Sequence, residues 1–236
     1  MLRRLWRGKI GGSFGAALLL ALCSCAAGPL ATTGESAWKA REDKLLLERN
    51  STNNTIVRLE GELLPDGTAA GQGLEETARA VLRTYHTELL IRDPDSEFVL
   101  ARSKRDQLGY THIRFTQQYQ GVPVWKAALD IHFDAQQRPY LLSGAYYPTP
   151  EEVDTNGGMG ENAALQNMAR IDPGAAARNY SVRKVIFFRD GRHPRLAYEL
   201  KPQGMAVLGG TVYIMDAATG EVLNRLPVIR TSRKHP

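Results

Sequence analysis

The sequence predicts an α+β fold of two modules, each a curved antiparallel β-sheet packed against a helix. Three observations lead to this prediction. Short runs alternate apolar and polar side chains, two longer runs carry apolar residues at helical spacing, and a stretch rich in proline, glycine and asparagine at residues 148–158 separates the two groups. A chain of 236 residues is long enough for two such modules.

Alternating runs predict the strands of both modules, because successive side chains of a strand point to opposite faces of the sheet. In the run 110–119, Ile113 and Phe115 face one side while His112 and Arg114 face the other. Three such runs joined by short turns indicate an antiparallel meander with one wet face. The predicted strands are residues 55–64, 110–119, 124–133 and 140–147 in the first module and 182–189, 195–201, 210–216 and 221–226 in the second.

Helical spacing of apolar residues predicts one core helix in each module. In the first module, Leu74, Val81 and Leu89 recur on one face, and Pro94 ends the pattern. We expect this helix to pack one face against the first sheet. The predicted helices are residues 73–91 and 162–171, with a further short one over residues 38–47.

The N-terminus is typical of a secretory signal peptide over residues 1–24, with a basic start and an apolar stretch too short to cross a bilayer. Leu22 and Ser24 precede Cys25 in a pattern similar to the bacterial lipobox, whose cysteine thiol takes a diacylglycerol. We therefore expect a lipoprotein acylated at Cys25, with residues 25–54 as a tether and N-terminal segment. Its expected place is the bacterial cell envelope, at the outer membrane facing the periplasm or the exterior. A plain cleaved leader with two incidental cysteines is the alternative.

The charge of the chain gives little support to a nucleic-acid partner. The formal net charge is +5, but four of the basic residues lie within the expected leader, at Arg3, Arg4, Arg7 and Lys9. The remainder is close to neutral, so neither nucleic acid nor an anionic membrane surface is favoured by electrostatics. Contact with the membrane is expected through the N-terminal lipid alone.

The stretch 108–148 resembles the fungalysin/thermolysin propeptide module, which forms the front part of the pro-region of thermolysin-like zinc peptidases. The resemblance rests on the combination T-H-I-R-F-x-Q-x-Y-x-G-V-P-V-W, then L-D-I-H-F-D, then S-G. It extends back to residue 73 and implies that the family's first strand lies at 98–100. The matched residues are Arg114, Phe115, Gln118, Tyr119, Gly121, Val122, Pro123, Val124, His132, Asp134, Ser143 and Gly144.

The second module resembles the PepSY module, which follows the first one in thermolysin-type pro-regions. The resemblance rests on L-A-Y-E-L at 196–200 and V-Y-I-M-D-A-A-T-G-E-V-L at 212–223. The residues of the D-A-x-T-G sequence favour a turn, because Asp216 can accept hydrogen bonds from backbone amides and Gly220 can take a positive φ.

No catalytic constellation accompanies these modules. A thermolysin-like peptidase needs H-E-x-x-H, in which two histidines one helical turn apart hold zinc beside a glutamate base. None of the five histidines is arranged in that way, and no P-loop, G-x-G-x-x-G or G-x-S-x-G is present. We therefore predict a binding protein with no catalytic residue, no metal and no cofactor.

Two histidines leave alternatives open. His112 and His132 lie on the polar faces of neighbouring predicted strands, near Arg114, Asp130 and Asp134 in the sequence. One interpretation is a metal-binding or pH-sensing site. The other, which we favour at this point, is a solvated or partner-facing sheet surface, because the spacing matches no known metal-ligand pattern.

The function that the resemblance implies is that of a stand-alone propeptide-like inhibitor or folding chaperone of a thermolysin-like zinc metallopeptidase. The expected partner-binding residues are Arg114, Gln118, Tyr119, Trp125 and His132, together with His235 and Pro236 of a basic tail that would lie in the peptidase cleft as a poor substrate. For the tail, a disordered terminus is the other interpretation and the one that we favour at this point. The alternative function is a structural or assembly lipoprotein that binds another envelope protein through the same fold. The expected modules are residues 55–148, propeptide-like, and residues 149–236, PepSY-like with the tail.

Overall fold

The computed structural model describes residues 44–228, apart from 66, 69–70, 177–178 and 204–209. The predicted lipidation site Cys25 and the predicted tail residues His235 and Pro236 therefore lie outside the described residues. Within the described part of the chain, no helix has the length and apolar character needed to cross a membrane.

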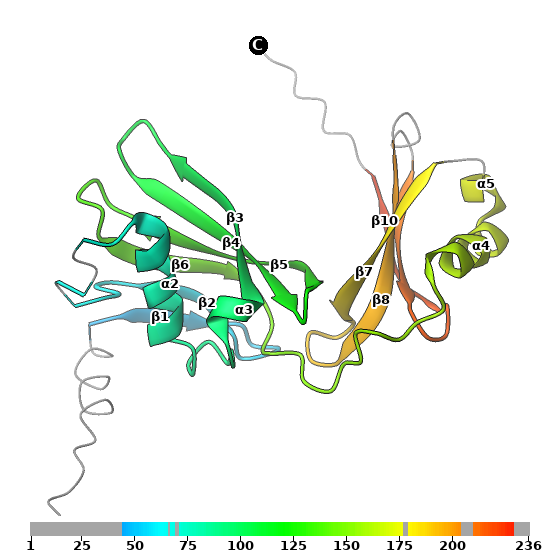
Figure 1. The fold of residues 1–236 in the computed structure, drawn as a ribbon, viewed down its shortest axis with the longest axis horizontal. Helices are drawn as coiled ribbons and strands as arrows, with labels where there is room; N and C mark the ends of the chain where they lie inside the picture. Colours follow the sequence, from blue (N-terminus) through cyan, green and yellow to red (C-terminus); the bar gives the residue numbers. More distant parts are fainter. Residues whose placement is uncertain (1–43, 66, 69–70, 177–178, 204–209, 229–236) are drawn as a thin grey trace, which may run out of the picture.

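The first sheet contains six antiparallel strands and carries helix α2 on one face (Figure 1). In spatial order the strands are β1 (Leu46–Arg49), β2 (Ile56–Glu60), β6 (Pro139–Ala145), β5 (Val122–Phe133), β4 (Thr111–Tyr119) and β3 (Phe98–Arg105). The helices of this part are α2 (Leu74–Thr84) and the single-turn α3 (Pro94–Glu97). The meander predicted over residues 110–147 is confirmed as β4, β5 and β6.

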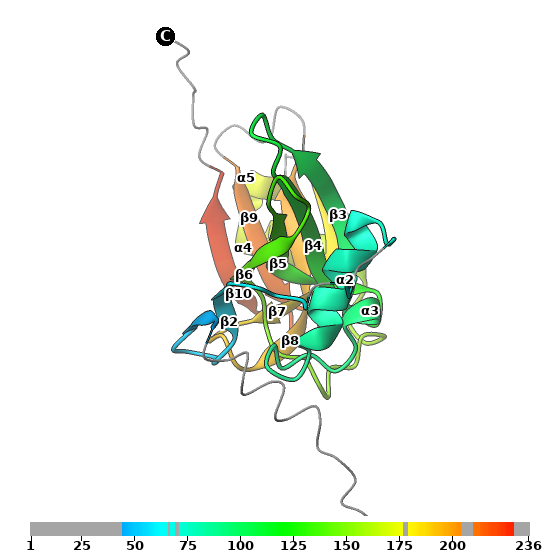
Figure 2. The ribbon, with the colours of Figure 1, turned by 90° about the vertical axis from the view of Figure 1, so that its left-hand side faces the viewer.

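The second sheet contains four antiparallel strands, with helix α4 beside them on the side away from the first sheet (Figure 1). Its strands, in order, are β7 (Tyr180–Phe188), β8 (Pro194–Pro202), β9 (Thr211–Asp216) and β10 (Val222–Pro227). Helix α4 (Glu161–Ile171) is followed by the short α5 (Pro173–Ala176). Figure 2, which looks along the long axis of the molecule, shows α2 and α3 in front and β7–β10 behind them. The predicted α+β class, with one helix against each curved sheet, is confirmed.

Helices α2 and α4 each cover an apolar face of their own sheet. Val81 and Leu82 of α2 are buried in one cluster with Phe115 and Leu129 of the first sheet. Met168 and Ala164 of α4 are buried in a second cluster with Tyr198 and Met215 of the second sheet. Burial of such side chains, at roughly 25 cal/mol per Å² of apolar surface, is what holds each helix on its sheet.

Strand β5 belongs to both sheets because it bends sharply near its middle. Thr116 of β4 pairs with Ala128, whereas Gln118, two residues on, pairs with Pro123, so β5 carries extra residues across this bulge. Lys126 within it has a φ of 57°. Beyond the bulge, Val124 pairs in parallel with Ile186 of β7 and so connects the two sheets.

The bend is accommodated by a glycine on the neighbouring strand. Gly144 of β6 has a φ of +151°, and a Cβ added there would lie 2.3 Å from the carbonyl oxygen of Ala128 and 3.0 Å from Leu129 Cα. Both neighbours are backbone atoms of β5, which cannot move without breaking the strand pairing. Glycine is therefore the residue that fits where β6 crosses the bent strand.

Helix α2 is shorter than predicted. The prediction placed the helix over residues 73–91, but it ends at Thr84 and the chain then forms turns. Leu90 has a φ of 60°, which a right-handed helix does not allow, and its carbonyl accepts a hydrogen bond from the Thr149 amide at 3.0 Å. Leu89 is still fully buried, so the apolar spacing identified the core residue but not the conformation.

The N-terminal predictions also need correction. A helix was predicted over residues 38–47, of which residues 38–43 lie outside the described part of the chain. Within the described part, Leu46 and Leu47 belong to β1, where they pair with Glu60 and Leu59. Pairing with β2 therefore overrides the local helical preference of this leucine-rich stretch. The strand β1 also lies within the segment 25–54 that we interpreted as a tether and N-terminal segment. The strand predicted over residues 55–64 is confirmed only for β2.

Candidate functional site

The face of the first sheet that points away from α2 carries the polar side chains of the meander, and we call it the open face. Strand register places these side chains in two rows that cross five strands. One row contains Arg102, Arg114, Asp130, Ser143 and Arg58, and the other contains Lys104, His112, His132, Leu141 and Glu60. The face is therefore mixed in charge, with most of its cations at β3 and β4.

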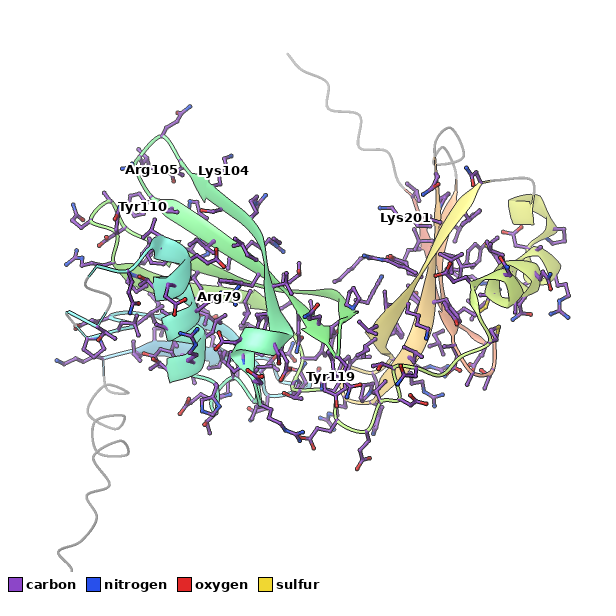
Figure 3. All side chains as sticks on the ribbon, viewed as in Figure 1. Arg79, Lys104, Arg105, Tyr110, Tyr119 and Lys201 are labelled. Atoms are coloured by element: carbon purple, nitrogen blue, oxygen red, sulfur yellow. The ribbon has the colours of Figure 1, made fainter. Side chains whose placement is uncertain are left out.

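Arg114 lies near the centre of the open face and remains partly available. Its Nη1 donates to Asp130 Oδ2 at 3.0 Å, while 42% of its side chain is exposed to solvent. Arg102 and Lys104 on the edge strand β3 form no ion pair with any described residue. Figure 3 shows Lys104 and Arg105 beside the β3–β4 turn. This edge of the sheet therefore presents cations whose charge is not neutralised within the described residues.

The two histidines of the open face contact each other directly. Nδ1 of His112 lies 2.7 Å from Nδ1 of His132. The far nitrogen of His112 lies 3.3 Å from Asp106 Oδ2, and the far nitrogen of His132 lies 3.1 Å from Ser143 Oγ. Four polar side chains from three strands and a turn thus form one continuous hydrogen-bonded chain.

The surroundings of His132 disfavour its charged form. Burial is the largest cause that lowers the pKa of His132, and the positive charges of His112 and Arg58 lower it further, against the opposing effect of Asp130. No group of three or more histidine, cysteine, aspartate or glutamate side chains is arranged to hold a metal ion among the described residues.

Trp125, one of the predicted partner-binding residues, contacts the second sheet within the chain. Its indole N–H donates to Glu199 Oε1 on β8 at 2.9 Å, and its ring packs edge-on against Phe187 of β7 with 5.4 Å between centroids. Glu199 also accepts a hydrogen bond from Arg183. Trp125 packs against a buried apolar cluster on the face of the second sheet that points away from α4, which contains Val185, Phe187, Ala197 and Ile214.

The remaining predicted contact residues lie at the far end of β4. Gln118 Nε2 donates to the Ser96 carbonyl at 2.9 Å, and Tyr119 packs with part of its side chain against the core of the first sheet. Figure 3 shows Tyr119 at the base of the molecule, where the two sheets meet. The structure thus brings Arg114 and His132 together on the open face and places Gln118, Tyr119 and Trp125 near the junction.

A hollow of about 420 Å³ lies where the open face meets the second sheet. Arg114 and Thr116 of β4, the bulge of β5 and Arg183 of β7 line it. The hollow exists because β5 turns away from β4 between Thr116 and Gln118. It places guanidinium groups from both sheets around one concavity, a pattern suited to carboxylate or carbonyl oxygens of a bound chain.

Several residues of this surface were not identified from the sequence. Lys104, Asp106, Ser143 and Arg183 became visible only through strand register and through the connection between β5 and β7. The Ser-Gly pair at 143–144 was quoted for its family pattern, but its spacing gives no hint of the histidine contact. A one-residue change in register would reverse the faces, so spacing along the chain does not reveal such neighbours.

Comparison with known proteins relates this surface to peptidase pro-regions. Residues 96–146 match the Fungalysin/Thermolysin Propeptide Motif. The chain is similar to the thermolysin of Alicyclobacillus acidocaldarius subsp. acidocaldarius, with 33% identity over 135 residues that cover 53% of this chain and 24% of that protein. It is also similar to the thermostable neutral protease NprT of Geobacillus stearothermophilus, with 29% identity over 178 residues, or 70% of this chain and 31% of that protein.

A further relative is the bacillolysin of Bacillus subtilis (strain 168), with 27% identity over 150 residues that cover 56% of this chain and 27% of that protein. The chain thus spans about a quarter to a third of the length of the curated relatives it matches. Among solved structures, the Bacillus megaterium YpeB C-terminal domain aligns over 84% of this chain and 97% of that chain, with a TM-score of 0.35 and 9% identity.

The matched motif coincides with the open face. Residues 96–146 contain the strands β3 to β6, which carry most of both polar rows. The chain is thus propeptide-like and related to thermolysin-type metallopeptidases, and its matched motif is a propeptide motif rather than a catalytic domain.

Proposed function

We propose that this protein binds a thermolysin-like zinc metallopeptidase in the bacterial cell envelope and acts on it as an inhibitor, a folding chaperone or both. The observation that supports this proposal most directly is the propeptide motif at residues 96–146, whose strands present the open face. In this proposal the chain performs no chemistry and works only through binding.

The open face and the hollow beside it form the proposed contact surface. Arg114 is central because it borders the hollow and keeps part of its guanidinium exposed. A stable complex of this class buries on the order of 1,600 Å² in total, which needs both the open face and the adjoining junction. Trp125 supports this surface from within, since it holds the second sheet against the bend of β5.

The proposal also includes an N-terminal lipid, the second module and the C-terminal tail. We place the protein at the outer membrane through a lipid on Cys25, and we assign the second module as PepSY-like. The basic tail with His235 and Pro236 would enter the peptidase cleft as a poor substrate. The lipid anchor, the PepSY-like assignment and the role of the tail follow from the sequence patterns.

The test is an inhibition and refolding assay with the mature forms of the three related peptidases, thermolysin, NprT and bacillolysin. We expect the purified full chain to slow casein hydrolysis in a dose-dependent manner, or to raise the yield of active enzyme when a pro-region-free peptidase is refolded. Arg114→Gln should weaken the effect about tenfold, in the range for loss of one charged contact at an interface. A chain that ends at Leu226 should bind but inhibit less.

A matched control is Arg170→Gln, because Arg170 is an exposed arginine of α4, far from the open face. It should behave as the unmodified chain does. If none of the three peptidases is inhibited or refolded, the proposal is wrong. Binding to a different envelope protein would then support the alternative of a structural or assembly lipoprotein.

A further inference from the structure

The contact between His112 and His132 is too short to be a chance approach of two side chains. The two residues are direct cross-strand partners on β4 and β5, and their Nδ1 atoms lie 2.7 Å apart. At this distance one nitrogen must carry a proton and donate it while the other accepts it with its lone pair. The pair therefore shares one proton between its two Nδ1 atoms.

The rest of the hydrogen-bonded chain can serve two protonation states of the pair. In the neutral state His112 donates from Nε2 to Asp106, and His132 donates from Nδ1 to His112 and accepts from the Ser143 hydroxyl. With one added proton, His112 donates from both nitrogens, and His132 accepts at Nδ1 and donates from Nε2 to Ser143. Every nitrogen keeps a partner in both states.

A second added proton is incompatible with this geometry. Both imidazoles would then carry N–H groups at Nδ1, and two donors cannot face each other at 2.7 Å. Two positive rings would also lie side by side in a half-buried setting, where charge repulsion is weakly screened. The rings must then separate, and β4 and β5 are the strands that carry them.

The charged neighbours act against this second proton from several elements. Arg58 of β2, Lys104 of β3 and Arg114 of β4 bring positive charge to the two polar rows around the pair. Glu60 is paired with Arg58 and Asp130 is paired with Arg114, so both nearby strand carboxylates are engaged by cations. Asp106 faces only the far side of His112, and Tyr140 of β6 packs near His132 with 6.5 Å between ring centroids.

A metal ion fits this pair less well than a proton does. Two imidazole nitrogens on one tetrahedral zinc, each about 2.0–2.1 Å from the metal, lie about 3.3 Å apart. The observed 2.7 Å is shorter, and the Asp106 carboxylate lies at the opposite nitrogen of His112, so no third ligand converges on the gap. The surrounding arginines and Lys104 would also repel a divalent cation.

We propose that the His112–His132 pair is a proton-operated latch of the open face. The latch is closed while the pair carries no more than one added proton, and it opens when acidification protonates both rings. Opening breaks the hydrogen bonds that connect Asp106, His112, His132 and Ser143. It also changes the shape and the charge of the open face.

This latch gives the proposed peptidase binding a direction of pH dependence, and that consequence rests on the proposed function. A partner seated on the open face removes more water from the pair and so makes the second protonation still less favourable. By linkage, acidification must then weaken the complex. We expect the complex to be tight near neutral pH and to be released at mildly acidic pH.

The latch itself can be tested without any partner. Ring nitrogens of the full chain, labelled with ¹⁵N at histidine, are followed by NMR from pH 8 to pH 4.5. We expect His112 and His132 to titrate as a coupled pair, with a direct coupling between their Nδ1 atoms near neutral pH that disappears on acidification. In His112→Gln the glutamine oxygen can accept a hydrogen bond from protonated His132. The midpoint of the His132 titration curve should therefore rise by about half a pH unit or more.

Two further variants keep this test decisive. His193→Gln is the matched control, because His193 is exposed and pairs with Asp190 on the β7–β8 turn, away from the open face, and it should leave both midpoints unchanged. His132→Gln should abolish the coupling between the two rings. Independent titration of the two rings in the unmodified chain would overturn the latch. A titration curve that changes with EDTA or added zinc would overturn it in favour of a metal site.

The partner measurement separates this inference from the proposed function. The dissociation constant for the peptidase is measured at pH 7.5 and pH 5.5 with the unmodified chain, His132→Gln and His193→Gln. We expect about tenfold weaker binding at the lower pH for the unmodified chain and the control, and less than twofold for His132→Gln. Equal pH dependence of all three chains contradicts the coupling. Absence of binding at pH 7.5 contradicts the proposed function, while the NMR titration still decides whether the latch exists.

Discussion

The two sheets of this protein share one plan but use their second faces differently. In each, a helix covers one face and buries an apolar cluster. The other face of the first sheet carries two rows of polar side chains, with His112 and Arg114 near their centre. The corresponding face of the second sheet carries a buried apolar cluster, with Trp125 of the first sheet packed against it.

The open face of the first sheet is therefore available to a partner, whereas the matching face of the second sheet is already covered within the chain. Phe187 illustrates it, because its ring is only 5% exposed although it points away from α4. Trp125 makes this contact from the bent part of β5, and the same bend borders the hollow beside Arg114. The apolar face of the second sheet therefore contributes to binding indirectly, by holding the open face in place.

The largest expected effect comes from filling the space where β6 crosses the bent strand. Gly144→Ala should destabilise the protein by about 3 kcal/mol, because the new methyl group meets two backbone atoms of β5 and φ stays positive. Chemical denaturation measures the loss. Gly121→Asn is the control, since Gly121 has a φ of +79° with no atom within 4 Å of an added Cβ, and its cost should stay below about 1 kcal/mol. Equal costs at both positions would show that the crossing of β5 and β6 is not tight.

The next effect tests whether Trp125 joins the two sheets. Trp125→Ala should cost about 2–3 kcal/mol, less than for a fully buried tryptophan, because part of the side chain is exposed. Trp125→Phe keeps a ring against Phe187 but loses the hydrogen bond to Glu199, and should cost about 1 kcal/mol. Hydrogen exchange should show faster opening of β7 in the alanine variant. Unchanged exchange in β7 would mean that the second sheet does not depend on the first.

The sequence predicts those features of the fold that depend on local alternation, and it misses those that depend on long-range packing. Alternation located β4 and β7–β10 closely, because half-buried strands impose a period of two on their residues. Neighbouring residues of a strand point to opposite faces, and Phe187 and Phe188 accordingly lie in different clusters. What alternation did not reveal is that both are buried, since the cover of Phe187 comes from Trp125, 62 positions earlier in the printed sequence.

The candidate site was predictable in its location but not in its chemistry. Arg114 and His132 were assigned to one wet face from spacing alone, and both lie there. The histidine contact, the role of Ser143 and the hollow beside Arg183 depend on register, on the bulge at Lys126 and on a single parallel pairing between β5 and β7. These are long-range features, and local sequence carries no signal for them.

The smallest expected effect contrasts the two sheets in their response to acid. Burial would raise the pKa of Asp216, but amide hydrogen bonds from Thr219 and Ala218 and the Arg195 guanidinium together lower it. A lowered carboxyl pKa stabilises the fold above the ordinary value of about 3.9, and this contribution is lost as the pH falls through the folded-state pKa. Asp216→Asn should therefore cost about 1 kcal/mol at neutral pH and flatten the loss of stability below about pH 4.

The first sheet should respond to acid in an additional, higher pH window, because it contains His132. The lowered pKa of His132 means that the unfolded chain binds the proton more readily, so stability falls as the pH drops below about 6.5. His132→Gln should remove that slope and leave the one near pH 4. Asp216→Asn should leave the slope below pH 6.5 and only reduce the one near pH 4, because the lowered pKa values of Asp106 and Asp134 also contribute to it. Denaturant unfolding measured at intervals from pH 7.5 to pH 3 separates the two windows. If either variant flattened both slopes, the sheets would unfold as one titrating unit, and the contrast between an available face and a used face would not extend to their energetics.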